Sequence, residues 1–367
     1  MKTPVRVAIV GCGAQAQLAH IPALRQNRSV EIVALCDPDI RKINHLRRLH
    51  GIPRHFLDFD DLNSAEGIDA VVIATPNHLH APMAIAAMEY GKDVLCEVPL
   101  ALNSEEAQAM VATAERLGRR LFPCLNTRLR PDVQTIRKYI EGGELGNVYY
   151  CKTGWLQGRE MWSLAGWRGQ RLRAGGGAFL SLGTPLLDFA LWLLRPHTPE
   201  SITGVVHLRP GRADVEDTAF AMLRLNGGGS AAGSRAKSAG ESGTSSVSKG
   251  LPAQSAGVLL TVEVGWSVTL ENDFRYFNAF GSAGAALLNP IQIHKEMHGH
   301  LVNVTPRIAA KGMQKASYKL LNDLWIDSLV RDVPQAIPAT DALAINRLAD
   351  AFYRSATEHC EVKLSET

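Results

Sequence analysis

Apolar and polar positions follow two different rhythms along the chain. In the first third, short runs of β-branched and other apolar residues predict strands at residues 5–10, 30–36, 69–74, 93–96 and 121–124. The stretches between them have helical spacing and predict helices at about residues 16–26, 39–49, 79–90 and 104–117. Strands that alternate with crossover helices favour a doubly wound parallel sheet, which is an α/β fold.

After residue 125 the rhythm changes to longer runs with a period of two. These runs predict strands at residues 148–153, 202–208, 218–225, 258–270 and 275–280. Helical spacing returns at about residues 133–140, 177–194, 317–331 and 341–358. We therefore expect two domains, a parallel-sheet domain at 1–125 and an α+β domain at 126–367 with a large, open, mostly antiparallel sheet.

One segment of the second domain has almost nothing to bury. Residues 226–257 contain eight Gly, eight Ser and six Ala, a composition typical of a flexible loop. Because the predicted strands 218–225 and 258–270 flank it, we expect a long insertion at the tip of a hairpin.

Composition limits the classes of partner. Apolar residues make up 46% of the chain, and 39 Lys+Arg against 36 Asp+Glu leave a net charge of +3 with no run of like charges. This argues against nucleic acid and anionic membranes as partners. No apolar stretch approaches the ~18 residues of a membrane span, and the six cysteines are scattered. A cytoplasmic location with reduced thiols is the expectation.

The turn after the first predicted strand has the spacing of a dinucleotide-binding motif. It reads Gly11-Cys12-Gly13-Ala14-Gln15-Ala16 and opens a helix, as in the Rossmann fold. Glycines at the first and third positions permit a tight turn and a close approach of a pyrophosphate to the backbone. Asp37 ends the second strand, where a carboxylate accepts from a ribose hydroxyl, so NAD is predicted. Arg41 is near enough to keep NADP open.

The chain also resembles a known enzyme family over essentially its whole length. The resemblance rests on the glycine turn with His20-Ile21-Pro22 and on three further motifs, Ala74–His80, Val94–Leu100 and Gly175–Asp188. Together they resemble the glucose-fructose oxidoreductase / inositol dehydrogenase / MocA family. The resemblance implies NAD(P)-dependent redox chemistry on a sugar, cyclitol or related polyol, and an open sheet whose face often serves homo-oligomerisation.

The resemblance also assigns residues to the site. It implies that the cofactor is bound by Gly11, Gly13, Ala14, Gln15, Asp37, Thr75, Pro76, Asn77, His80 and Glu97. It suggests substrate-binding roles for Asn126, Arg128, Trp167 and Arg168, near the family's entry into the second domain. No metal is expected in such a site.

The family's proton-handling residues are replaced in this chain. Its catalytic lysine position is Val98, in Glu97-Val98-Pro99, and its helical Asp and His positions are Ser181 and Pro185. Alcohol oxidation needs a group that accepts the hydroxyl proton, and Val and Pro cannot do so. His80 and Asp188 are the candidates that remain. The alternatives are that His80 only positions the cofactor together with Asn77, and that Asp188 is a structural hydrogen-bond acceptor.

A small histidine cluster stands apart from these motifs. His294, Glu296, His298 and His300 alternate within seven residues, which would place them on one side of an extended segment. We interpret them as a solvated polar face, with metal ligation as the alternative.

Two functions remain open from the sequence. The first is an NAD(P)-dependent oxidoreductase with a rebuilt proton relay. The second is a catalytically silent NAD(H)-binding protein that acts in regulation or binds a partner protein, with residues 226–257 as a partner-recognition segment.

Overall fold

The computed structural model describes residues 4–158, 166–209, 211, 213–227, 257–308 and 311–364. Its first layer is a six-stranded parallel sheet in the order β3-β2-β1-β4-β5-β6. The strands are β1 (Val5–Val10), β2 (Val30–Cys36), β3 (Arg54–Phe56), β4 (Ala70–Ile73), β5 (Asp93–Cys96) and β6 (Leu121–Pro123). This confirms the predicted doubly wound sheet.

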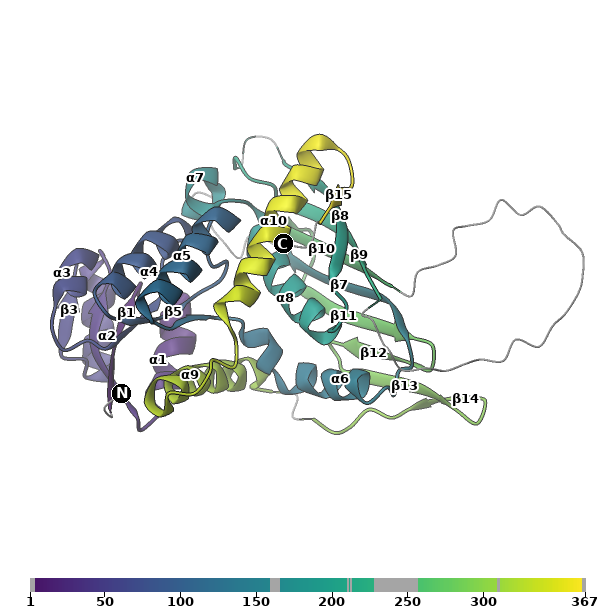
Figure 1. Cartoon of the computed structure of the whole chain (residues 1–367), viewed down its shortest axis with the longest axis horizontal. Coiled ribbons are helices and arrows are strands. Elements are labelled where there is room, and N and C mark those ends of the chain that lie inside the picture. Colours follow the sequence, from purple (N-terminus) through teal and green to yellow (C-terminus); the bar gives the residue numbers. More distant parts are fainter. Residues whose placement is uncertain are drawn as a thin grey trace, which may run out of the picture.

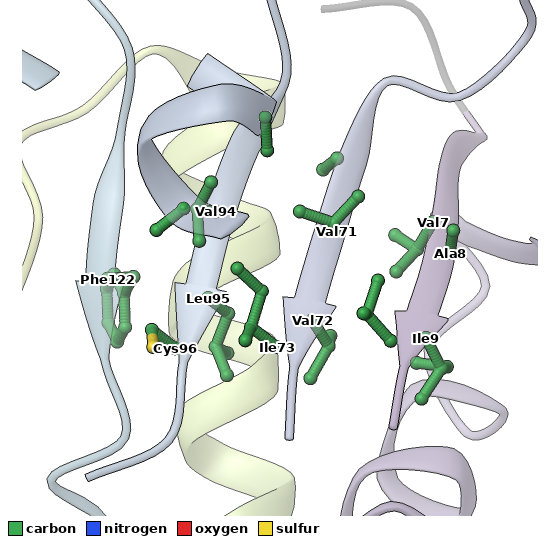
Figure 2. Packing of buried hydrophobic residues seen from close by; sticks show 14 of the residues in the cluster. Val7, Ala8, Ile9, Val71, Val72, Ile73, Val94, Leu95, Cys96 and Phe122 are labelled. Atoms are coloured by element: carbon green, nitrogen blue, oxygen red, sulfur yellow. The ribbon is translucent and has the colours of Figure 1, made fainter. Parts of the chain in front are cut away.

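Apolar side chains fill both faces of this sheet. Figure 2 shows Val7, Ile9, Val71, Ile73 and Val94 packed between neighbouring strands. The covering helices include η1 (Ala16–His20), α1 (Ile21–Leu24), α2 (Ile40–His50), α3 (Phe59–Ser64), η2 (Asn77–Leu79), α4 (His80–Glu89) and α5 (Ser104–Leu117). The pattern missed β3 and α3, because both are short and β3 forms the half-buried edge of the sheet.

The second layer is a nine-stranded sheet in the order β14-β13-β12-β11-β7-β10-β9-β8-β15. Its strands are β7 (Val148–Gly158), β8 (Pro199–His207), β9 (Thr218–Leu225), β10 (Val258–Val268), β11 (Phe274–Gly281), β12 (Gly284–Leu288), β13 (Gln292–Met297), β14 (His300–Asn303) and β15 (Val362–Lys363). Of these strand pairs, β7 and β10 run parallel and the others antiparallel. The predicted mostly antiparallel sheet is thus confirmed, and the pattern missed its shorter outer strands.

Strands β9 and β10 pair directly, from Val258 opposite Leu225 to Gly265 opposite Thr218. The segment 226–257 therefore joins the two strands at the tip of a hairpin. Residues 228–256 lie outside the described part of the chain, and so does the loop predicted there.

Four helices of the second half pack on one face of this sheet (Figure 1): α6 (Pro131–Glu141), η5 (Phe179–Gly183), α8 (Thr184–Leu193) and α10 (Ala339–Glu358). The others are η4 (Trp167–Gly169), α7 (Arg171–Ala174) and α9 (Met313–Arg331). In the described residues, only Arg171–Leu193 is long and apolar enough to cross a membrane, and 78% of its most apolar window is buried inside the protein. From the sequence, we predict no apolar stretch of this length. The structure shows one, and it is a buried helical segment of the core.

The two hydrophobic cores share the end of the chain. Tyr318, Leu321 and Trp325 of α9 belong to the core of the first sheet, although α9 follows the second sheet along the chain. Helix α10 contributes Leu343 to the first core and Phe352 to the second. The division at residue 125 stays a prediction, and the last two helices tie both sheets together.

Candidate active site

The glycine turn between β1 and η1 has the geometry that a dinucleotide requires. Gly11 has a φ of +91°, and a Cβ there would lie 2.5 Å from the carbonyl oxygen of Ala74, so only glycine fits. A Cβ on Gly13 would meet no atom within 4 Å. Ala14 and Gln15 follow as exposed residues, and Gln17 N donates to Gly13 O at 3.1 Å. The open space beside Gly13 therefore faces the first N–H groups of a helix, which favour an anion.

Asp37 lies at the end of β2 beside this turn. Its Oδ2 accepts from Cys12 N and its Oδ1 accepts from Asp39 N, each at 2.8 Å. Lys42 Nζ lies 3.9 Å from Oδ1, and Arg41 donates to Asp39 instead. Each oxygen of a carboxylate has two lone pairs, so Asp37 retains capacity for a ribose hydroxyl.

The turn after β4 carries Thr75, Pro76 and Asn77. Asn77 Nδ2 donates to Ala174 O at 2.9 Å and so links the turn to α7 of the second half. Thr75 Oγ1 and His78 Nδ1 are buried and have no hydrogen-bond partner among the residues that the structure describes. Buried polar atoms are rarely left unpaired, so these two are open to a ligand at the carboxyl edge of the sheet.

His80 is buried between two backbone carbonyls. Its Nδ1 lies 2.9 Å from Pro99 O and its Nε2 lies 3.0 Å from Thr75 O. Burial lowers the pKa of His80, although both carbonyl contacts oppose that shift. Since neither ring nitrogen is free, the contacts favour the interpretation that His80 positions these two turns. Its role as a base remains a prediction.

Glu97, at the carboxyl end of β5, is the centre of a buried polar cluster. His20 Nε2 lies 2.9 Å from Glu97 Oε1, and the Tyr318 hydroxyl donates to the same oxygen at 3.3 Å. Val98 N donates to Oε2 at 3.3 Å. Burial by itself raises the pKa of Glu97, but the hydrogen bond and charge of His20 outweigh it, and the net shift is downward. The structure therefore favours an ionised carboxylate one residue before Val98.

The same cluster brings three potential metal ligands together. The ligand atoms of His20, Glu97 and Cys124 lie within 4.8 Å of one another. Burial and the charge of Glu97 raise the pKa of Cys124 well above its ordinary range, so the thiol keeps its proton beside Glu97. The direct contact of His20 with Glu97 also occupies the space of an ion. The donor set therefore fits a hydrogen-bonded cluster better than a metal.

The sequence assigned no role to His20 or Tyr318. His20 belongs to the motif His20-Ile21-Pro22, but its partner Glu97 is 77 positions away along the chain. Tyr318 is 221 positions from Glu97 and lies on α9. The only available signal was a histidine on an otherwise apolar helical face, which is more often a core residue than a functional one.

Two of the positions where the sequence analysis expects catalytic residues to be replaced lie four residues apart in the second half. Ser181 and Pro185 are spaced by four residues in η5 and α8, and both are partly exposed while their helix neighbours are buried. Val98 is also partly exposed. None of the three side chains titrates near neutral pH.

Asp188 lies farther along α8 and is paired with an arginine. Arg128 Nε donates to Asp188 Oδ2 at 2.9 Å and Arg128 Nη2 donates to Oδ1, a bidentate ion pair. Arg128 also contacts Asp341 at 2.5 Å, and Arg195 contacts Asp341 at 2.9 Å. Asp188 is 1% exposed, and burial raises its pKa against the opposing charge of Arg128. These contacts favour the structural interpretation of Asp188.

Arg128 and Asp188 also line a cavity of about 820 Å³ between α8, β8 and α10. The cavity wall includes Trp192, His197 and Asp341 but none of the predicted cofactor residues. It lies at the end of α8 opposite Ser181, so it is separate from the glycine turn.

The other predicted substrate residues take different positions. Asn126 is buried and donates to Ser317 Oγ at 2.9 Å, which ties η3 (Asn126–Leu129) to α9. The Arg168 guanidinium lies over the Trp167 ring at 4.4 Å, and burial lowers the pKa of Arg168. The role of these residues in substrate binding stays a prediction.

The histidine cluster at 294–300 is divided by a turn. His294 lies in β13 and His300 in β14, which pair as a hairpin, while His298 has a φ of +55° in the connecting turn. The expected continuous alternation is therefore wrong, because the chain reverses direction at His298 and Gly299.

Two models of known protein families match this chain. Residues 5–124 match the oxidoreductase family with an NAD-binding Rossmann fold, and residues 133–246 match the GFO/IDH/MocA C-terminal domain. The chain belongs to the GFO/IDH/MocA oxidoreductase family. The two matches together cover more than half of the chain, and they include the glycine turn, Asp37, Glu97 and helix α8.

Curated relatives match at moderate identity. A putative UDP-kanosamine synthase oxidoreductase subunit of Amycolatopsis mediterranei (strain S699) is 34% identical over 236 residues, which are 60% of this chain and 64% of that protein. The D-glucoside 3-dehydrogenase of Escherichia coli (strain K12) is 24% identical over 99% of this chain and 98% of its own. The match thus spans less than two thirds of the first of these relatives.

Solved structures share the whole fold. Levoglucosan dehydrogenase in complex with NADH and levoglucosan has a TM-score of 0.81 and 21% identity, over 99% of this chain and 100% of that one. The WlbA dehydrogenase from Bordetella pertussis, in complex with NADH and UDP-GlcNAcA, has a TM-score of 0.79 and 24% identity, over 100% and 99%. At these identities the likeness concerns the fold.

Proposed function

We propose that this protein is an NAD-dependent oxidoreductase that acts on a sugar or related polyol. The observation that carries the proposal is the glycine turn, where Gly11 has no substitute and the space beside Gly13 is open. The names of two relatives, a D-glucoside 3-dehydrogenase and a levoglucosan dehydrogenase, support the substrate class. NAD, when bound, supplies the acceptor of the hydride.

The residues present fit this cofactor. The turn at Gly13 would bind the pyrophosphate, Asp37 would accept from a ribose hydroxyl, and Thr75 Oγ1 has no other partner. Asp37 would also repel a 2′-phosphate, which favours NAD over NADP. Lys42, 3.9 Å from Asp37, weakens this preference.

The proton relay would be rebuilt around Glu97. Oxidation breaks the C–H and O–H bonds of one alcohol group and forms a carbonyl, so the hydroxyl proton needs an acceptor. Glu97 is the ionised group adjacent to Val98, and His20 Nε2 lies 2.9 Å from its Oε1. His80 and Asp188 are weaker candidates, because their polar atoms already contact backbone carbonyls and Arg128.

A substrate screen tests the proposal. Purified protein with NAD and a panel of aldoses, glycosides and cyclitols should form reduced nicotinamide with at least one member. If no member of the panel reduces NAD although the protein still binds NAD tightly, the result would count against the proposed function. The triple variant Val98→Lys, Ser181→Asp, Pro185→His is a useful companion, because a gain of activity would show that the site still accepts a substrate of the family.

A silent NAD(H)-binding protein is the second candidate. It is favoured by the absence of a titrating side chain at Val98, Ser181 and Pro185. It predicts a higher Tm with NADH, since a ligand of the native state stabilises it, and no turnover. The segment 226–257 would then be its contact with a partner protein.

The outer face of the second sheet would be covered by another copy of the chain. Val205 lies opposite Phe220 in the β8–β9 ladder, and their exposed fractions are 62% and 45%. Met222 and Leu259 add apolar area on the neighbouring positions. Light scattering should show an oligomer that Phe220→Glu weakens.

We also place the protein in the cytoplasm, where its free cysteines would stay reduced.

A further inference from the structure

An arginine of the second sheet, Arg275, lies where this sheet meets η3. Arg275, near the start of β11, is directly opposite Trp155 of β7 in the ladder. Its guanidinium carbon lies 4.5 Å from the centre of the Trp155 ring. Its Nη2 lies 3.5 Å from Thr127 Oγ1, at the limit of a hydrogen bond. The guanidinium thus lies over an aromatic ring, with Nη2 toward η3.

Neighbouring arginines are neutralised, and Arg275 is not. Arg128 is paired with Asp188, and Arg130 with Asp132 at 2.6 Å. No carboxylate of the described chain pairs with Arg275, and its buried Nε has no hydrogen-bond partner. Burial lowers the pKa of Arg275 to about 10, the charge of Arg130 adds to that shift, and the charge of Asp132 opposes it. The side chain therefore remains a cation at neutral pH, and Asp132, which is paired with Arg130, offsets its desolvation only in part.

The location connects Arg275 to the proposed site. Thr127 lies in η3, directly after β6 of the first sheet, and the carboxyl ends of β4, β5 and β6 lie at the same edge. Asn126, one residue before Thr127, was predicted to bind substrate. Ligands of open α/β sheets bind outside the carboxyl ends of the strands. Arg275 therefore approaches that edge from the second sheet, on the side away from the glycine turn.

We propose that Arg275 binds an anionic group of the substrate, a carboxylate or a phosphate carried by the sugar. Two Nη groups of one guanidinium match two oxygens of either group, and the Trp155 ring fixes the plane of the fork. Thr127 Oγ1 offers a further hydrogen bond to the same oxyanion. This inference deepens the proposed function and rests on it, because it concerns the substrate of the same site.

Calorimetric titration of the NADH-loaded protein tests this subsite. The probes are D-glucose, D-glucuronate and D-glucose 6-phosphate, which differ in the anionic group. The variants are Arg275→Gln and Arg275→Lys, and the matched control is Arg137→Gln. Arg137 also stacks on a tryptophan, Trp192 at 4.8 Å, but it has a carboxylate partner in Glu141.

We expect wild type to bind at least one of the two acids about tenfold or more tightly than D-glucose, a difference typical of a charge-assisted pair. Arg275→Gln should abolish this preference and leave the affinity for D-glucose and NADH unchanged. Arg275→Lys should keep part of it, and Arg137→Gln all of it. A preference for glucuronate alone identifies a carboxylate, and one for the phosphate ester alone identifies a phosphate.

Three results would overturn the inference. They are equal or absent binding of the three sugars by wild type, an acid preference that survives in Arg275→Gln, and a loss of NADH affinity in that variant. The outcome is separable from the proposed function. If no sugar reduces NAD but the acid preference depends on Arg275, the subsite stands and the oxidoreductase proposal fails.

Discussion

The two halves that meet at the candidate site differ in how closely they keep the family's pattern. On the first sheet, the glycine turn and Asp37 have the positions and contacts of a nucleotide site. On η5 and α8, Ser181 and Pro185 stand at the positions where the sequence analysis expects the family's titrating residues, and Asp188 is bound to Arg128. Under the proposed function, the backbone of the first sheet binds the cofactor, and the proton chemistry comes from other side chains.

The comparison also shows what a retained residue can mean. His80 and Asp188 are both kept from the family's motifs, and both are 1% exposed. Each makes its contacts within the protein, His80 to two turns and Asp188 to η3. Retention of a titratable residue therefore indicates a positioning role here as readily as a catalytic one.

The largest effect is expected from Glu97→Gln. Removing a general base typically lowers turnover by about 10²–10⁴-fold, and the isosteric amide keeps the hydrogen bond from Tyr318. Steady-state rates with the best sugar measure this, beside Tyr318→Phe, which removes only the 3.3 Å contact and should cost far less. Equal rates for wild type and Glu97→Gln would assign the proton to another group.

The same substitution has a signed effect on stability. Because the pKa of Glu97 is lowered in the folded protein, its ionised form stabilises the fold at neutral pH. This contribution is fully present above the unfolded-state pKa and is lost as the pH falls through the lower folded-state pKa. The difference in unfolding free energy between wild type and Glu97→Gln should therefore shrink on the acid side, in denaturant titrations at several pH values.

Arg128→Ala should destabilise the fold by about 3–5 kcal/mol, because it leaves Asp188 buried without its partner. Denaturant unfolding at neutral pH measures the loss. The double variant Arg128→Met, Asp188→Leu removes both charges and should be less destabilised than Arg128→Ala. A larger loss of unfolding free energy in the double variant would mean that the unpaired Asp188 carboxylate is not what destabilises Arg128→Ala.

The two glycines of the turn should separate folding from binding. Gly11→Ala places a Cβ 2.5 Å from Ala74 O at a φ of +91°. It should therefore lower the unfolding free energy by about 1–3 kcal/mol and weaken the binding of NADH. Gly13→Ala has free space and should keep its Tm while NADH affinity falls about tenfold. Nicotinamide fluorescence measures the NADH affinity of each variant, and thermal unfolding measures its Tm. Unchanged NADH affinity in Gly13→Ala would place the pyrophosphate elsewhere.

The smallest effect is expected at Asp37. Asp37→Asn removes the charge that repels a 2′-phosphate, so the preference for NADH over NADPH should narrow by about threefold to tenfold. Competition titrations of the two cofactors measure it. A preference that stays the same or widens would mean that Asp37 does not set it.

Much of the fold could be predicted from the sequence because its signals are local. The apolar runs of β1 and β4 and the glycine turn after β1 depend on residues that are neighbours along the chain. The β9–β10 pairing could be predicted because both strands have a clear period of two on either side of one Gly/Ser-rich segment. Short elements such as β3 and β14 could not be predicted, since three or four residues carry too little periodicity.

The site was predictable only where its contacts are local or follow a motif. The glycine turn and Asp37 follow one strand and one helix. The Glu97 cluster needs His20 and Tyr318, and the Arg275 stack needs Trp155, from segments far apart along the chain. Only the packing of α9 on the first sheet and the register of β7 with β11 bring these residues together.

Deuterium transfer tests the central claim most directly. NADH deuterated at C4 of the nicotinamide is mixed with the protein and a panel of keto-sugars, and the sugars are then analysed by mass spectrometry. We expect one deuterium in the product alcohol of at least one sugar, with much less from Glu97→Gln in the same time. Deuterium that stays on the nicotinamide with every sugar, while the protein binds the cofactor, would contradict hydride transfer and leave the silent NAD(H)-binding protein as the better account.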